Sequence, residues 1–101
     1  MQKKKYVVPG EYIETIEDIA RLCMKKEKEI GIDGYDMAVI EQIQHYCNKA
    51  YSDNRCEDII ISNDNYVILK QYTAFIINHD LYDKNESLQQ MRKLLDFLNK
   101  Q

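Results

Sequence analysis

Glycine and proline are scarce in this chain of 101 residues, which contains three glycines and one proline. Phosphate-binding loops need glycines so that backbone amides can approach the phosphate, and Gly10, Gly31 and Gly34 fit neither the Walker nor the dinucleotide-binding spacing. We therefore exclude nucleotide binding by either motif. No Pro-, Gly- or Ser-rich stretch marks a linker and the length suits one domain, so we predict a single helical domain over residues 1–101.

Cysteine is scarce too, and the three that occur, Cys23, Cys47 and Cys56, are an odd number. A domain of this size buries a core without disulfides, so free thiols are the simplest interpretation, with a Cys47–Cys56 bridge as the alternative. His45, Cys47 and Cys56 have the chemistry of zinc ligands, but structural zinc sites normally use close pairs such as C-x-x-C, which the sequence lacks. We expect Cys23 and Cys47 in the core, Cys56 near solvent, and no cofactor.

Long apolar runs and an excess of one charge are both missing. No segment approaches the roughly 20 apolar residues of a membrane span, and the start of the chain lacks a signal-peptide pattern, so we expect a cytoplasmic protein with no membrane partner. Lys and Arg number 14 against 17 Asp and Glu, for a net charge of −3. The two signs are mixed along the chain, which argues against a general DNA-binding protein.

The many residues with A/T-rich codons indicate a low-GC bacterium or one of its phages.

Four segments repeat apolar residues at three- and four-residue steps, the spacing of amphipathic helices. The first segment follows the single proline and ends near Ile30, with Gly31 as its stop. Thr15 and Asp18 are an alternative N-cap pair for this helix. The second helix should cover residues 35–51.

Asp33 or Asp36 can cap the second helix, and its short connection to the first predicts an antiparallel hairpin. The third helix should cover residues 65–78, with Asp64 as its cap. The last helix should begin at Asn85 or Ser87, because Ser87 and the glutamine three residues later match a capping box.

Three consecutive isoleucines at residues 59–61 favour a short buried strand. The only comparable segment is residues 6–8, so we predict that the two pair; an irregular buried crossover is the alternative. The predicted fold is therefore all-α or nearly so, a compact four-helix bundle with this minor two-stranded pairing.

One constellation of residues could hold a metal. His79-Asp80, with His45 before it and Asp83 or Asp96 after it, is similar to the His, His-Asp, Asp set that binds a divalent metal in phosphohydrolases of the HD type. Those enzymes embed the set in a larger helical domain, and His and Asp at a helix end are ordinary cap and loop residues. A metal-dependent hydrolase using His79 and Asp80 is a rival hypothesis; we predict instead that the protein is not an enzyme.

Residues 20–44 have the layout of a helix-turn-helix, with glycine in the turn. The second helix carries Asp36 and Glu41 where a helix that reads a DNA groove would carry Arg, Asn or Gln. A small nucleic-acid-binding regulator is the other rival hypothesis, and nucleic acid is the less favoured partner.

Tyrosine is abundant, with eight residues and no tryptophan. It is favoured in cores and at recognition surfaces because it combines apolar area with a polar tip. Tyr46 and Tyr51 lie at the edges of the second helix's apolar stripe, near Arg55, and Tyr82 lies in a loop. We predict these four as a partner-binding patch; the alternative is that they cover helix joints. The hypothesis is a small intracellular protein that binds another protein, or itself as a homo-oligomer, as an inhibitor, immunity factor or phage-encoded accessory.

Overall fold

The computed structural model describes residues 4–52 and 57–101. The chain begins with the strand β1 (Lys5–Val8), a 3-10 turn (Gly10–Tyr12) and the helix α1 (Ile13–Lys25). The short helix α2 (Glu27–Ile30), the long helix α3 (Gly34–Ser52) and the strand β2 (Ile59–Ser62) follow. The helices α4 (Asn63–Asn78) and α5 (Asn85–Asn99) complete the order.

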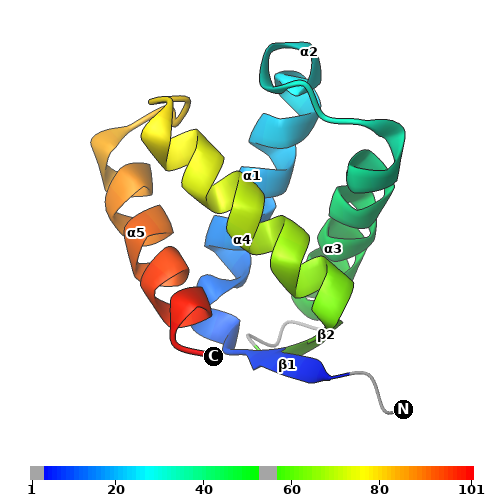
Figure 1. The fold of residues 1–101 in the computed structure, drawn as a ribbon. Coiled ribbons are helices and arrows are strands. Elements are labelled where there is room, and N and C mark those ends of the chain that lie inside the picture. The colour runs from blue at the N-terminus through cyan, green and yellow to red at the C-terminus, as the bar shows by residue number, and fades with distance from the viewer. Residues whose placement is uncertain (1–3, 53–56) are drawn as a thin grey trace.

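The architecture is mostly helical, as predicted, with a small two-stranded sheet. The helices α1 and α4 each contact the other three long helices, so these two lie at the centre of the packing. Figure 1 shows α4 crossing α1 obliquely, with the sheet below the helices. The four-helix bundle that we expected is not confirmed.

The sheet confirms the predicted pairing of residues 6–8 with 59–61. The strands β1 and β2 are antiparallel, and Val7 lies opposite Ile60. Because successive side chains of a strand point to opposite faces, one face of the sheet is buried against the helices and the other faces outward. The inward positions are Tyr6, Val8, Ile59 and Ile61.

The first predicted helix is interrupted. The helix α1 ends at Lys25 because Lys26 (φ −115°, ψ 26°) leaves helical geometry, and α2 then adds a single turn. The helix α2 has no fully buried side chain, although its Ile30 is half-buried and packs against the core. Gly31 ends α2 at φ 78°, a left-handed conformation that glycine adopts without strain, which confirms the predicted stop.

The caps of α1 and α3 differ in how well the sequence predicted them. Thr15 lies buried inside α1, and this helix has no side-chain cap, so the Thr15–Asp18 alternative is wrong. At α3, the Asp33 Oδ1 accepts a hydrogen bond of 2.8 Å from the backbone N–H of Asp36, which confirms Asp33 as a cap.

The caps predicted for the last two helices are wrong. Ser62, not Asp64, caps α4: its Oγ accepts a hydrogen bond of 3.2 Å from the N–H of Asn65, and the helix starts directly after β2. The helix α5 begins at Asn85, which confirms one of its two predicted starts, but it has no side-chain cap, and Ser87 lies within its first turn rather than before it.

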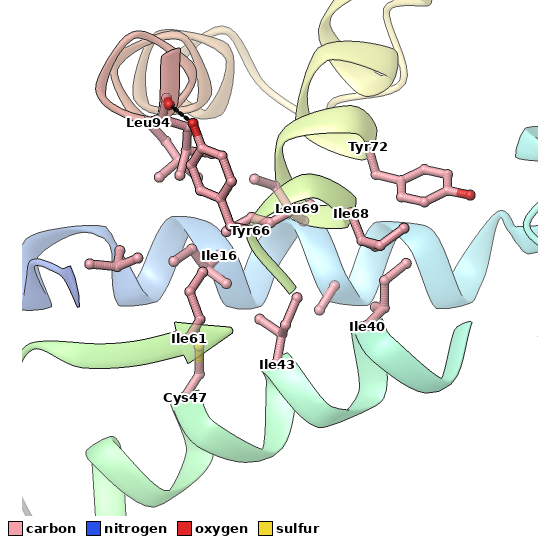
Figure 2. Close-up of a cluster of buried hydrophobic side chains, with 14 of the residues drawn as sticks. Ile16, Ile40, Ile43, Cys47, Ile61, Tyr66, Ile68, Leu69, Tyr72 and Leu94 are labelled. Atoms are coloured by element: carbon pink, nitrogen blue, oxygen red, sulfur yellow. Dashed lines mark hydrogen bonds between the residues drawn. The ribbon is translucent and has the colours of Figure 1, made fainter. Parts of the chain in front are cut away.

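The core is one cluster of buried side chains from the sheet and the four long helices. Figure 2 shows part of it, where Ile16 of α1 lies among side chains of α3, α4, α5 and β2. The most deeply buried large side chains are Ile16, Ile43, Ile61, Ile76, Met91, Leu94 and Leu98. Cys23 and Cys47 are fully buried with free thiols, which confirms their predicted place in the core. Cys56, the second cysteine of the alternative Cys47–Cys56 bridge, lies outside the described residues.

In the part of the chain that the structure describes, no helix is both long enough and apolar enough to cross a membrane.

Candidate functional site

Tyr46 lies on α3 in the wall of a groove between this helix and the start of β2. The groove has a volume of about 190 Å³, and Ala50 and Ile60 also line it. Tyr46 is half-buried and packs against the core. The prediction that Tyr46 lies at the edge of an apolar stripe, partly accessible to a partner, is compatible with this position.

Of the other three predicted patch residues, the structure describes the side chain of Tyr82 alone, and Tyr82 does not lie beside Tyr46. Tyr51 belongs to the last turn of α3 and Arg55 lies outside the described residues. Tyr82 lies in the loop between α4 and α5, half-buried, and its hydroxyl donates a hydrogen bond of 3.4 Å to Asp80 Oδ1. Figure 1 places this loop at the opposite end of the molecule from the sheet and the C-terminal end of α3.

The outward face of the sheet carries an apolar pair that the sequence did not reveal. Val7 is 51% exposed and its cross-strand partner Ile60 is 61% exposed. Ile60 also lines the groove beside Tyr46, so the exposed pair and the groove are continuous. We call Val7, Ile60, Tyr46 and Ala50 the sheet surface. Its signal in the sequence is apolar residues at positions where a solvent-facing strand normally carries polar ones.

Charges of opposite sign stand at the two ends of this sheet. Lys5 lies opposite Ser62 at one end, and Asp58 precedes β2 at the other. The Asp58 carboxylate accepts a hydrogen bond of 3.1 Å from the N–H of Gly10, which joins the end of β2 to the turn after β1. A partner of the sheet surface therefore meets a basic side chain at one end and an acidic one at the other.

Several tyrosines serve the fold instead of a surface. The rings of Tyr6 and Tyr66 stack with centroids 3.9 Å apart, and the Tyr66 hydroxyl donates to the backbone carbonyl of Leu98. Figure 2 shows this hydrogen bond as a dashed line from the Tyr66 hydroxyl. The Tyr72 hydroxyl donates a hydrogen bond of 2.5 Å to Asp36. Burial, together with this bond and the charge of Asp36, raises the pKa of Tyr72. These three tyrosines hold the sheet, α4, α5 and α3 together.

The residues of the metal hypothesis are dispersed. His79 caps the end of α4 and its ring stacks on Phe75 with centroids 4.1 Å apart, while His45 is exposed on α3. Asp80 adopts φ 53° in the turn that follows and accepts the bond from Tyr82. Among residues 4–52 and 57–101, no three His, Cys, Asp or Glu side chains are placed to hold one metal ion.

Comparison of the chain with protein-family models, with curated proteins and with solved structures finds no match. The functional argument therefore starts from the geometry of the sheet surface.

Proposed function

We propose that this protein is a small intracellular interaction module that regulates or inhibits another protein by binding it through the sheet surface. The observation that carries the proposal is the exposed cross-strand pair of Val7 and Ile60 beside the groove that contains Tyr46. Single exposed apolar residues are common on protein surfaces, but here two are adjacent and continuous with a groove.

The backbone of the sheet also supports a binding role for the sheet surface. A two-stranded sheet has two edges, and among the described residues no further strand pairs with the outer edge of β1 or β2. Peptide segments of partners commonly pair with such edges, while pockets beside the edge select side chains. The groove next to β2 is placed to act as such a pocket, with the ring of Tyr46 as one wall.

Burial of the pair supplies a useful amount of binding energy. A fully buried Val or Ile side chain gains about 1.5–3 kcal/mol, and these two are about half exposed, so each gains roughly 1 kcal/mol when a partner covers it. Tyr46 adds aromatic area at low entropic cost, as tyrosines at binding hot spots do.

The test is an Ile60→Lys substitution, compared with Val67→Lys as the matched control. Val67 is an exposed apolar residue, 47% accessible, but it lies on α4, so the control adds the same charge outside the sheet surface. Burying an unpaired ammonium against a partner is costly, so we expect capture of the partner from a host lysate to fall about tenfold or more for Ile60→Lys and less than about twofold for Val67→Lys.

Far-UV circular dichroism of both variants checks that the fold is retained. Equal capture by the wild-type protein and the Ile60→Lys variant would rule out the sheet surface as the binding site. Light scattering on the purified protein separates a heterologous partner from a second copy of the chain, since the latter raises its mass without any lysate.

A further inference from the structure

The two edges of the small sheet differ in their surroundings. The strand β2 contacts α3, and the groove that contains Tyr46 lies between them. No residue of β1 lines this groove, and among the described residues no strand continues the sheet beyond β1. Figure 1 shows β1 along the lower boundary of the molecule, below the helices. The outer edge of β1, which we call the β1 edge, is therefore open to a further strand.

The β1 edge has charges of opposite sign at its two ends. Lys4 and Lys5 are exposed at its start, and the Lys4 ammonium lies 5.0 Å from the centre of the Tyr6 ring, which holds it beside the strand. Glu11 is exposed in the turn just after the other end, where Asp58 is also exposed and bound to that turn. Lysines on an edge strand usually discourage pairing with other chains, so a suitable partner strand must bring acidic groups to the lysine end.

A second copy of the chain meets this requirement when its β1 runs antiparallel. Lys4 and Lys5 of one copy then lie next to the end that carries Glu11 and Asp58 of the other copy. A two-fold axis repeats the contact, so opposite charges meet at both ends of the joined strands. Parallel pairing would instead place lysines beside lysines and acids beside acids, which is destabilising. The charge pattern therefore favours a second copy in the antiparallel orientation.

The same pairing joins the exposed apolar side chains of the two copies. A two-fold axis perpendicular to the sheet keeps the outward side chains of both copies on one face, because the alternation of side chains along each strand is unchanged. Val7 lies on β1 and its cross-strand neighbour Ile60 lies on β2, so two such exposed pairs become neighbours across the joint. Four strands also make a more stable sheet than two, since a two-stranded sheet is marginal by itself.

We propose that two copies of this chain pair through their β1 edges in antiparallel orientation and form one four-stranded sheet, in the order β2-β1-β1-β2. The inference goes beyond the proposed function, because the dimer needs no other protein and leaves the groove beside β2 open to one. It adds that another protein would meet two sheet surfaces side by side.

The test measures the mass of the purified protein by sedimentation equilibrium from about 1 µM to about 1 mM. We expect the wild-type chain to pass from monomer to dimer within this range, since a small interface gives a weak dimer. The Lys4→Glu, Lys5→Glu double variant should raise the dimer dissociation constant about tenfold or more, because acids then meet acids at both ends. Glu11→Lys should raise it about threefold or more, because lysines then meet lysines.

Mixing these two variants in equal amounts separates antiparallel from parallel pairing. In the mixed dimer each end again joins a basic segment to an acidic one, since one copy has its lysines replaced and the other its glutamate. We expect the mixture to dimerise within about threefold of the wild-type dissociation constant, although neither variant does so alone. Under parallel pairing neither variant would dimerise more weakly than the wild type, because the wild type would already bring like charges together. Far-UV circular dichroism of each variant checks that the fold is retained.

Hydrogen exchange followed by mass spectrometry locates the interface without any substitution. Alternate N–H groups of β1 point away from β2, and in the dimer they form hydrogen bonds with the second copy. The β1 segment should therefore exchange about threefold more slowly or less at about 1 mM protein than at about 1 µM. Equal exchange at the two concentrations, in a sample that dimerises, would place the interface elsewhere and overturn the proposal.

The matched control is the Lys25→Glu, Lys28→Glu double variant, which makes the same charge change at exposed positions. Lys25 ends α1 and Lys28 lies in α2, which Figure 1 places at the end of the molecule opposite the sheet. The dimer dissociation constant should change less than about twofold. A wild-type protein that stays monomeric at about 1 mM, equal weakening in the control variant, or a mixture that dimerises no better than its two folded components would each overturn the proposal. None of these results involves capture of another protein, so the sheet surface proposal is decided by its own experiment.

Discussion

Among single residues, the two buried cysteines have the most clearly altered chemistry. Burial raises the pKa of the Cys23 thiol from its ordinary value of 9.0 to about 12. Burial, with a smaller contribution from the charge of Glu17, does the same for Cys47. The cause is the poor solvation of a thiolate in the core. Both thiols are therefore neutral at physiological pH and unsuited to nucleophilic or redox chemistry, in agreement with a role in packing.

These shifts predict how stability depends on pH. Above pH 9.0 the unfolded chain releases the two thiol protons, whereas the folded chain retains them until about pH 12. The free energy of unfolding should therefore be unaffected by these groups below pH 9.0 and fall as the pH rises from there to about 12. Each thiol contributes a slope of up to about 1.4 kcal/mol per pH unit.

Urea unfolding at about pH 7.5, about pH 9.5 and about pH 10.5 measures how the free energy of unfolding changes with pH. The Cys23→Ala, Cys47→Ala variant is the control: it is less stable throughout because it loses core packing, but its stability should fall less steeply. Parallel pH profiles for the two proteins would contradict the assignment of the slope to the thiols.

Among the helices and strands, the apolar repeats of the long elements and the Asp33 cap of α3 were predictable, whereas the break at Lys26 and the cap of α4 were not. Apolar periodicity identified the long helices, and the isoleucine triplet identified β2, because burial of a repeated face dominates their stability. Where a helix starts depends on which of several neighbouring polar residues has an extended backbone conformation, because that residue can act as the cap. Ser62 (φ −72°, ψ 167°) ends β2 in that conformation, so it caps α4 before Asp64 can. The junction between β2 and α4 is set by the pairing of β2 with β1, and the sequence around Ser62 carries no information about that pairing.

Replacement of the two serines tests this account of the caps. Ser62→Ala should lower the free energy of unfolding by about 1 kcal/mol, because it leaves the N–H of Asn65 without its acceptor. Ser87→Ala changes a residue within the first turn of α5 that the sequence favoured as a cap, and should cost less than about 0.5 kcal/mol. Denaturant midpoints of the two variants decide which serine acts as a cap. A larger loss of stability in Ser87→Ala than in Ser62→Ala would instead support the capping box at Ser87.

The candidate site residues also differ in whether the local sequence is enough to predict them. The sequence singled out Tyr46, because it lies at the edge of a helical stripe that can be read locally. It could not single out Val7 and Ile60, since which side of each strand faces outward is decided by pairing with a distant segment and by packing on the helices.

At the scale of the whole molecule, the buried side chains form one cluster to which the sheet and the four long helices all contribute. The stack of Tyr6 on Tyr66, with ring planes 6° apart, lies where β1 meets α4 and reports on tertiary packing. A single shared core predicts that secondary and tertiary structure are lost together.

Thermal unfolding followed by two signals tests this prediction. Far-UV circular dichroism reports the helices, and near-UV dichroism reports the stacked tyrosines. We expect the two transitions to coincide within error, as they do for a cooperative domain. If the tyrosine signal disappeared at a lower temperature than the helical one, the chain would consist of more than one cooperative unit.

The pairing of β1 with β2 has a consequence for how the protein is made. Residues 9–58 lie between the two strands, so β1 is synthesised well before the segment that completes its sheet exists. At a translation rate of about 5–20 residues per second, β1 waits roughly 3–10 seconds for its partner strand. During that interval Tyr6 and Val8 have no sheet in which to be buried. The strand β1 is thus stabilised in a sheet only after β2 has been synthesised, and until then the nascent chain carries an apolar strand without its partner.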